Sequence, residues 1–230
     1  MSAPALPAPG FADPTRDAQR AFRAVLDALA HPTRSYPVAG PREPPAALGR
    51  GLAAVALTLL DEDCAVWLGG ALGRDAEVAA WLAFHTGARR VDNPGAADFV
   101  IAGPDALPPL ASLALGTDEA PHLSATVVLD VRGYANPAAD PATGVATAAA
   151  ASPAAGLAAG AARFTMRGPG IDGSAELAAP WAPEGFAEAW QRNTELFPRG
   201  VDLLLVDSGT ATGLPRTTLL AEVEPCGPGS

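Results

Sequence analysis

The sequence predicts an α/β protein, a single domain in which a mixed sheet is covered by helices. Helical and strand patterns alternate from Asp13 to Ala102, as they do when a sheet is built from strand–helix units. Several predicted strands are apolar at every position, which is typical of strands buried on both faces. The last third of the chain carries closely spaced strand patterns joined by short turns, which indicates hairpins and therefore a mixed sheet.

The individual elements have recognisable signals. Asp13-Pro14 supplies a capping acid followed by proline at the first helical position, and His31-Pro32 ends that helix. Gly87 can adopt the left-handed conformation that closes a helix. Pro108-Pro109 leaves residues 107–115 ambiguous. The other expected helices span residues 46–60, 74–85 and 184–196, and the expected strands span residues 35–38, 64–68, 98–102, 124–131 and 163–167, with a last pair of strands opening at Val201.

We expect residues 1–230 to form one domain with three irregular segments. Residues 1–10 have neither a basic residue nor an apolar core, so we expect a disordered tail and no signal peptide. Residues 135–160 are rich in Ala, Pro, Gly and Thr, which predicts a mobile insertion. Residues 225–230 form a polar C-terminal tail. The longest apolar stretch, residues 52–60, is too short to span a bilayer.

Composition excludes several kinds of chemistry. The net charge of −10 disfavours nucleic acid and anionic membranes as partners. All 15 basic residues are arginine, so the chain can form no Schiff base with pyridoxal phosphate and has no Walker A lysine. Cys64 and Cys226 stand far apart, and the three histidines are scattered without metal-ligand spacing. We therefore expect no metal and no cofactor, and the low cysteine content fits the cytoplasm.

Two motifs match known functional loops but favour plain turns. The run GPGIDG at residues 168–173 fits G-x-G-x-x-G, yet residues 174–180 are too few for the helix that a dinucleotide site needs, so we predict a tight turn. The run LLLVDSGT at residues 203–210 resembles the aspartic-protease loop. Only 20 residues follow Thr210, so the sequence favours a hairpin turn at Asp207-Ser208-Gly209.

The candidate anion-binding residues are Arg216, Thr217, Thr218 and His85. A guanidinium beside two hydroxyls on a strand suits phosphate or phosphonate. The alternative is an arginine paired with a core carboxylate, with threonines chosen for the strand. His85 ends a predicted helix, where interaction with the helix dipole is the simpler interpretation. Arg89-Arg90 is ambiguous in a similar way: the two arginines either bind an anion or form a solvated pair on the surface.

Ten short segments together resemble the PhnH family, a subunit of the bacterial carbon–phosphorus lyase core complex. Their order and spacing, more than any one of them, carry the resemblance. The segments are DAQRAFR (17–23), LTLLD (57–61), VWL (66–68), FHTGA (84–88), ADF (97–99), LGTDEAP (115–121), SAT (124–126), RGPGI (167–171), FPRGVDLL (197–204) and LPRTT (214–218). The chain departs from the family pattern at His31-Pro32-Thr33, at Arg199 and in its long Ala-rich stretch.

The resemblance implies a homodimer with a fold similar to pyridoxal-phosphate transferases but without the cofactor site. It implies a complex with PhnG-, PhnI- and PhnJ-like subunits that transfers an alkylphosphonate onto the ribose of ATP with loss of adenine. Since the residues show no nucleophile–base pair, we expect an assembly subunit without a complete active site. The alternative is an enzyme subunit that contributes residues to a shared phosphonate or nucleotide site.

Overall fold

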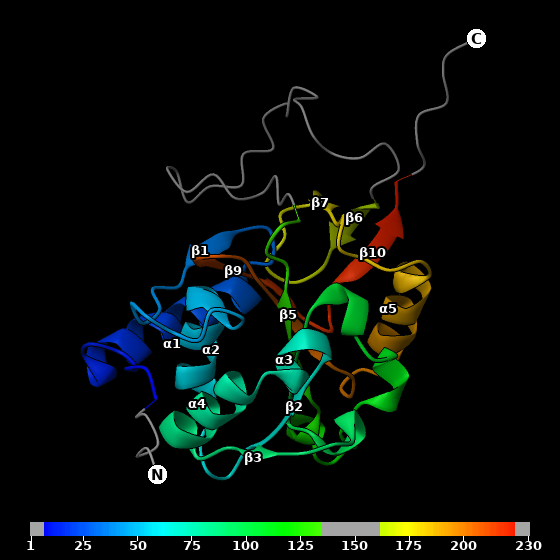
Figure 1. Cartoon of the computed structure of the whole chain (residues 1–230). Coiled ribbons are helices and arrows are strands. Elements are labelled where there is room, and N and C mark those ends of the chain that lie inside the picture. The colour runs from blue at the N-terminus through cyan, green and yellow to red at the C-terminus, as the bar shows by residue number, and fades with distance from the viewer. Residues whose placement is uncertain (1–6, 135–161, 224–230) are drawn as a thin grey trace, which may run out of the picture.

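The computed structural model describes residues 7–134 and 162–223, which contain a seven-stranded mixed sheet with helices packed on it (Figure 1). The predicted α/β class with a mixed sheet is thus confirmed. The strands lie in the order β1-β9-β8-β5-β4-β2-β3. The expected mobile insertion at residues 135–160 and the expected tail at residues 225–230 lie outside the described residues.

The sheet is parallel in its centre and antiparallel at one side. Its parallel strands are β2 (Ala65–Leu68), β3 (Arg89–Arg90), β4 (Phe99–Ala102), β5 (Thr126–Asp130) and β8 (Asp202–Val206). β9 (Thr210–Leu214) runs antiparallel to β8, and β1 (Ser35–Pro37) runs antiparallel to β9. The Asp207 amide donates to the Thr210 carbonyl at 3.0 Å, which confirms the predicted hairpin turn.

A second, antiparallel sheet contains β10 (Leu219–Glu222), β6 (Arg163–Arg167) and β7 (Ala175–Ala178), in that order. The G-x-G-x-x-G run joins β6 to β7, and its glycines all have positive φ: 146° at Gly168, 78° at Gly170 and 66° at Gly173. A strand follows the third glycine, where a dinucleotide site requires a helix. The prediction of a tight turn is confirmed.

The helices begin and end close to their sequence signals. They are α1 (Pro14–Ala30), α2 (Gly49–Leu59), α3 (Gly70–Arg74), α4 (Ala76–Thr86) and α5 (Phe186–Glu195), with short 3-10 turns η1 (Pro94–Ala96), η2 (Pro104–Ala106), η3 (Leu110–Ser112) and η4 (Pro121–Leu123). Asp13 caps α1 by accepting from the Arg16 amide, and Gly87 closes α4 with φ of 72°.

Two expected helices differ in extent. The helix expected at residues 46–60 starts only at Gly49, because residues 46–48 form a turn. The helix expected at residues 74–85 is α4, which starts only at Ala76, because Asp75 caps it by accepting from the amides of Glu77 and Val78. Asp75 also ends α3, a short helix before the expected range that the sequence did not predict. The ambiguous residues 107–115 contain η3 between loops.

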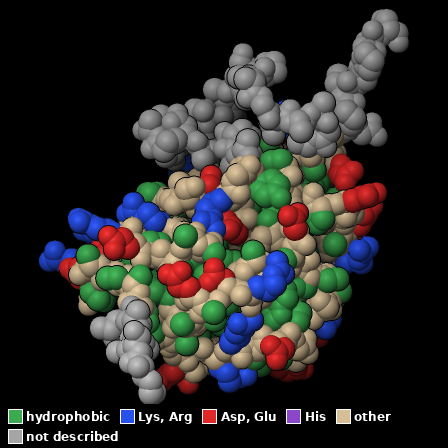
Figure 2. All heavy atoms as spheres, viewed as in Figure 1, with side chains coloured by type: hydrophobic (Ala, Val, Ile, Leu, Met, Phe, Trp, Pro, Cys, Tyr) green, Lys and Arg blue, Asp and Glu red, His purple; other side chains and the backbone are tan. Residues whose placement is uncertain are grey.

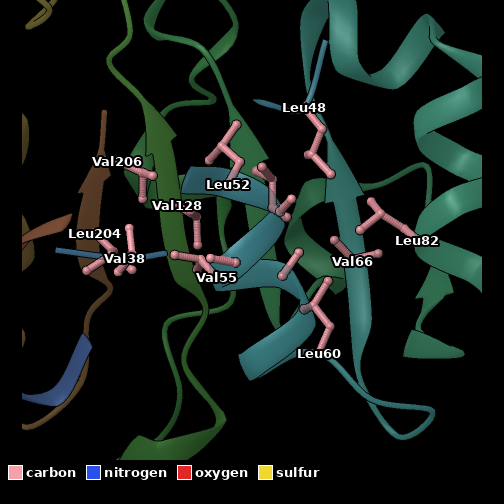
Figure 3. Close-up of a cluster of buried hydrophobic side chains, with 14 of the residues drawn as sticks. Val38, Leu48, Leu52, Val55, Leu60, Val66, Leu82, Val128, Leu204 and Val206 are labelled. Carbon is pink, nitrogen blue, oxygen red and sulfur yellow. The ribbon is translucent and has the colours of Figure 1, made fainter. Parts of the chain in front are cut away.

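Apolar side chains pack on both faces of the large sheet. Helices α1, α2 and α4 cover one face, and Figure 3 shows Leu52 and Val55 of α2 against Val128 and Leu204 of the sheet. Helix α5 and the small sheet contribute to a second buried cluster, which contains Trp190, Phe164, Val127 and Leu203. Successive strand residues point to opposite faces, and residues 127–129 of β5 and 203–205 of β8 are apolar and buried at every position.

Helix α1 lies unusually close to β9. A Cβ on Gly213 would stand 2.5 Å from the Ala28 carbonyl oxygen, nearer than real Cβ atoms approach such an atom. Ala28 is itself fully buried in α1. The absence of a side chain at Gly213 is therefore what lets the helix rest on this strand.

The face in Figure 2 carries interspersed arginines and carboxylates with apolar side chains between them, so no field of a single sign covers it. Within the described residues, no helix has both the length and the apolar character needed to cross a membrane.

Candidate functional site

Arg216 lies in a turn and not on a strand, which corrects the expectation from sequence. β9 ends at Leu214, and Pro215 has no amide hydrogen with which to continue the ladder. The Thr218 amide donates to the Pro215 carbonyl at 2.8 Å and closes the turn that leads into β10. Arg216 therefore stands in a hydrogen-bonded turn that connects the large sheet to the small one.

The Arg216 guanidinium is held by a carboxylate and two carbonyl groups. Its Nε donates to Asp202 Oδ1 at 3.1 Å and its Nη2 to Oδ2 at 2.5 Å, while the Arg216 amide donates to Oδ1 at 2.7 Å. Its Nη1 donates to the carbonyls of Pro121 and Pro198, each at 3.2 Å. The two charged side chains are only 15% and 22% exposed. The sequence left open whether Arg216 binds an anion or pairs with a carboxylate of the protein. In the structure it is paired with Asp202.

This pairing decides the electrostatics of the site. The Asp202 carboxylate compensates the arginine charge. An incoming anion would therefore have to compete with a bidentate ion pair inside the protein. Asp202 is also the first residue of β8 and pairs with Thr126 at the start of β5. The cluster thus lies at the amino edge of the parallel strands, whereas open α/β sheets usually bind ligands beyond the carboxyl ends.

A surface depression of about 390 Å³ lies against Arg216. Its walls come from η4, from the loop after α5 and from the turn after β9. The lining residues are Pro121, His122, Phe197, Pro198, Asp202, Pro215, Arg216 and Thr217. Most of them are prolines or carry a ring, so the depression is more apolar than an anion cradle.

Sequence reasoning missed Asp202, His122 and Phe197 as parts of this site. A signal for Asp202 existed, because a hairpin turn at residues 207–209 brings the start of β8 opposite the residues after β9. The observed register pairs Leu203 with Leu214, which leaves Asp202 beside the turn that carries Arg216. No spacing rule links Pro121 or His122 to that turn, since they reach it only through the packing of the sheet.

The two threonines lie in different environments. Thr217 lines the depression. Thr218 is fully buried, and its carbonyl accepts the indole Nε1–H of Trp190 at 2.7 Å. Its Oγ1 has no hydrogen-bond partner among the described residues. The two hydroxyls expected to act together therefore do not face the same space.

His85 contacts none of these residues and instead holds the N-terminal segment. In the last turn of α4, its Nε2 donates to the Ala8 carbonyl at 2.8 Å, and the Trp81 indole Nε1 donates to the same oxygen at 2.8 Å. The His85 ring also lies 4.6 Å from that of Trp81 and 5.0 Å from that of Phe84, measured between centroids. Ala8 and Gly10 thus lie against α4, whereas residues 1–6 of the expected N-terminal tail lie outside the described residues.

The carboxyl edge of the sheet carries another internal ion pair. Arg132 donates through Nη2 to Asp130 Oδ2 at 2.7 Å and to the Ala47 carbonyl at 2.6 Å. The hydrogen bond to Asp130 raises the pKa of Arg132.

Residues 7–134 and 162–223 contain no group of three His, Cys, Asp or Glu side chains placed to share a metal ion. Arg89 and Arg90 are exposed on the edge strand β3.

Comparison with known proteins places the chain in the family that its sequence motifs resemble. A family model described as bacterial phosphonate metabolism protein (PhnH) matches residues 9–221, and the chain is a member of that family. It is also 36% identical over 211 residues to the alpha-D-ribose 1-methylphosphonate 5-triphosphate synthase subunit PhnH of Rhizobium meliloti (strain 1021). That match covers 91% of this chain and 93% of the relative. The resemblance to the PhnH family is confirmed.

Proposed function

We propose that this chain is a subunit of a multi-subunit synthase in alkylphosphonate utilisation, where it supports transfer of an alkylphosphonate onto the ribose of ATP with loss of adenine. The observation that carries the proposal is the similarity to the R. meliloti synthase subunit, which extends over nearly the whole of both chains. The family model matches residues 9–221, which include both Arg216 and Asp202.

The contacts of the candidate residues favour an assembly role over a complete active site. Arg216 is committed to Asp202 and to two backbone carbonyls, and His85 is committed to the Ala8 carbonyl. A residue that joins segments of its own chain has fewer donors left for a substrate. We infer that these side chains chiefly stabilise the fold that the subunit presents to its partners.

The finer features of the proposal follow from the family. We infer a single domain over residues 1–230, a fold related to pyridoxal-phosphate transferases, a homodimer, a cytoplasmic location, and association with PhnG-, PhnI- and PhnJ-like subunits. The R. meliloti relative is described as a subunit, which supports the existence of partner chains.

A second candidate is an enzyme subunit that lends residues to a shared phosphonate or nucleotide site. The observation in its favour is the depression where Arg216, Thr217 and His122 meet. Thr217→Val removes the hydroxyl from this surface without breaking the Arg216–Asp202 pair. Under this candidate the variant loses growth on methylphosphonate while the assembled complex stays intact, and under the assembly role it grows normally.

Complementation tests the proposed function. The host is R. meliloti strain 1021 lacking its own PhnH, supplied with this chain, and methylphosphonate is the only phosphorus source. We expect the chain to restore growth, while an empty vector does not, and all strains to grow alike on phosphate. Soluble expression of the chain without growth on methylphosphonate contradicts the proposal.

A further inference from the structure

We propose that the depression beside Phe197 is a docking surface for another subunit, which inserts one large apolar side chain there and carries a lysine or arginine next to it. The proposal deepens the assembly role and rests on it. It concerns the surface formed by Pro121, His122, Leu123, Phe197, Pro198 and Pro215, which we call the Phe197 surface.

The Phe197 surface exposes more apolar area than a lone surface residue does. Phe197 is 64% exposed and Leu123 is 58% exposed, and both stand on segments that line the depression. Pro121, Pro198 and Pro215 complete its apolar walls. Scattered exposed apolar residues are ordinary, but two large ones beside a concave, proline-lined surface are typical of a binding site.

The walls of this surface are held in place before any partner arrives. Nη1 of Arg216 donates to the Pro121 carbonyl in one wall and to the Pro198 carbonyl in the other. The ring of each proline fixes its own φ angle. A surface that is already ordered loses little conformational entropy on association, so more of the contact energy appears as affinity.

Charge indicates what kind of chain fits. Asp202 compensates Arg216, and Asp118 lies 3.1 Å from Nε of Arg199, so these four charges balance. Glu119, which precedes Pro121 by two residues, is exposed and is in none of the ion pairs of the described residues. It gives the rim a negative excess that a lysine or arginine of the partner would offset. A second copy of this chain, with its net charge of −10, would bring the same acidic excess.

The position in the fold agrees with a partner protein. The Phe197 surface lies at the amino edge of the parallel strands, because Asp202 begins β8. Small ligands of open α/β sheets bind at the opposite, carboxyl edge. The docked subunit would therefore leave that edge accessible.

The test compares two exposed phenylalanines in the full chain. Phe197→Asp places a charge in the depression, and Phe84→Asp is the matched control because Phe84 is 61% exposed on α4. The ligand is the R. meliloti PhnG-, PhnI- and PhnJ-like subunits produced without PhnH, and the dissociation constant is measured by biolayer interferometry. We expect Phe197→Asp to weaken binding about tenfold or more and Phe84→Asp to change it less than about twofold. Far-UV circular dichroism checks that both variants fold.

Glu119→Gln tests the charge argument separately. We expect it to weaken binding about threefold at low salt, with the difference vanishing at high salt because ions screen surface charges. An unchanged affinity at low salt would overturn the basic-partner part of the proposal.

Four other results would overturn the docking surface. One is wild-type affinity in Phe197→Asp, and another is equal loss in both Phe variants. A third is dissociation of a homodimer by Phe197→Asp with unchanged partner binding, which would make the occupant a second copy. The fourth is loss of ATP or methylphosphonate binding in that variant with assembly intact. If the wild-type chain restores growth and binds the subunits while Phe197→Asp keeps wild-type affinity, this inference fails while the proposed function stands.

Discussion

Replacing Arg216 by alanine should destabilise the protein strongly, because it removes one partner of a largely buried ion pair. The side chains of Arg216 and Asp202 are 15% and 22% exposed, and the arginine also binds the Pro121 and Pro198 carbonyls. Breaking a fully buried pair costs about 3–5 kcal/mol, since the remaining charge is left without compensation. The partial exposure here lets water reach Asp202, so we expect a loss of about 3 kcal/mol in the free energy of unfolding.

That loss corresponds to a fall in Tm of roughly 6–12 °C for a chain of this length. The assay is equilibrium unfolding in urea, followed by far-UV circular dichroism, in which the midpoint shifts while the slope is retained. Arg167→Ala is the control, because Arg167 is exposed on β6, and its effect should stay within about 0.5 kcal/mol.

A double-mutant cycle sharpens the result. The variants are Arg216→Ala, Asp202→Ala and both together, and we expect a coupling energy of about 1–3 kcal/mol. If Arg216→Ala unfolds within about 0.5 kcal/mol of the wild type, the structural role is refuted. If it also abolishes growth on methylphosphonate, the guanidinium acts on substrate.

Three further changes test other parts of the structure. Thr218→Val should be neutral or stabilise by up to about 1 kcal/mol in urea unfolding, because it removes a buried hydroxyl with no partner; lost growth on methylphosphonate would instead give that hydroxyl a functional role. Gly213→Ala should destabilise by about 1–3 kcal/mol, since its Cβ meets α1, and an unchanged urea midpoint would contradict this packing. Burial raises the pKa of the Cys64 thiol, and the Asp61 carboxylate that accepts its S–H bond raises it further. Asp61→Asn should therefore lower that pKa, increase the thiolate fraction near pH 8 and speed iodoacetamide alkylation in a Cys226→Ser background; slower alkylation would reverse the inferred sign.

Local signals predicted most of the fold correctly. Asp13-Pro14 begins α1 and Gly87 ends α4 because capping depends on residues that are neighbours in the sequence. The apolar central residues of β5 and β8 are buried on both faces of the sheet, as their composition indicates. The separate small sheet was not foreseen, because its strands β6 and β10 are more than fifty residues apart and no local pattern indicates that they pair.

The candidate site was predicted less well, and the reason is physical. Arg216 was expected on a strand from its β-branched neighbours, but Pro215 ends the ladder and places it in a turn. Whether its guanidinium faces a carboxylate or a ligand depends on Asp202, and on carbonyls from segments far away in the sequence. His85 was grouped with it by residue type, whereas its hydrogen bond goes to the N-terminal segment.

The central claim, that this chain works as an assembled subunit in phosphonate use, is tested most directly by recovering its complex from working cells. A tagged copy is produced in R. meliloti strain 1021 that lacks its own PhnH and grows on methylphosphonate, and the purified material is quantified by mass spectrometry. The account predicts PhnG-, PhnI- and PhnJ-like subunits in amounts close to that of the tagged chain. Recovery of the chain alone from cells that grow on methylphosphonate would contradict it.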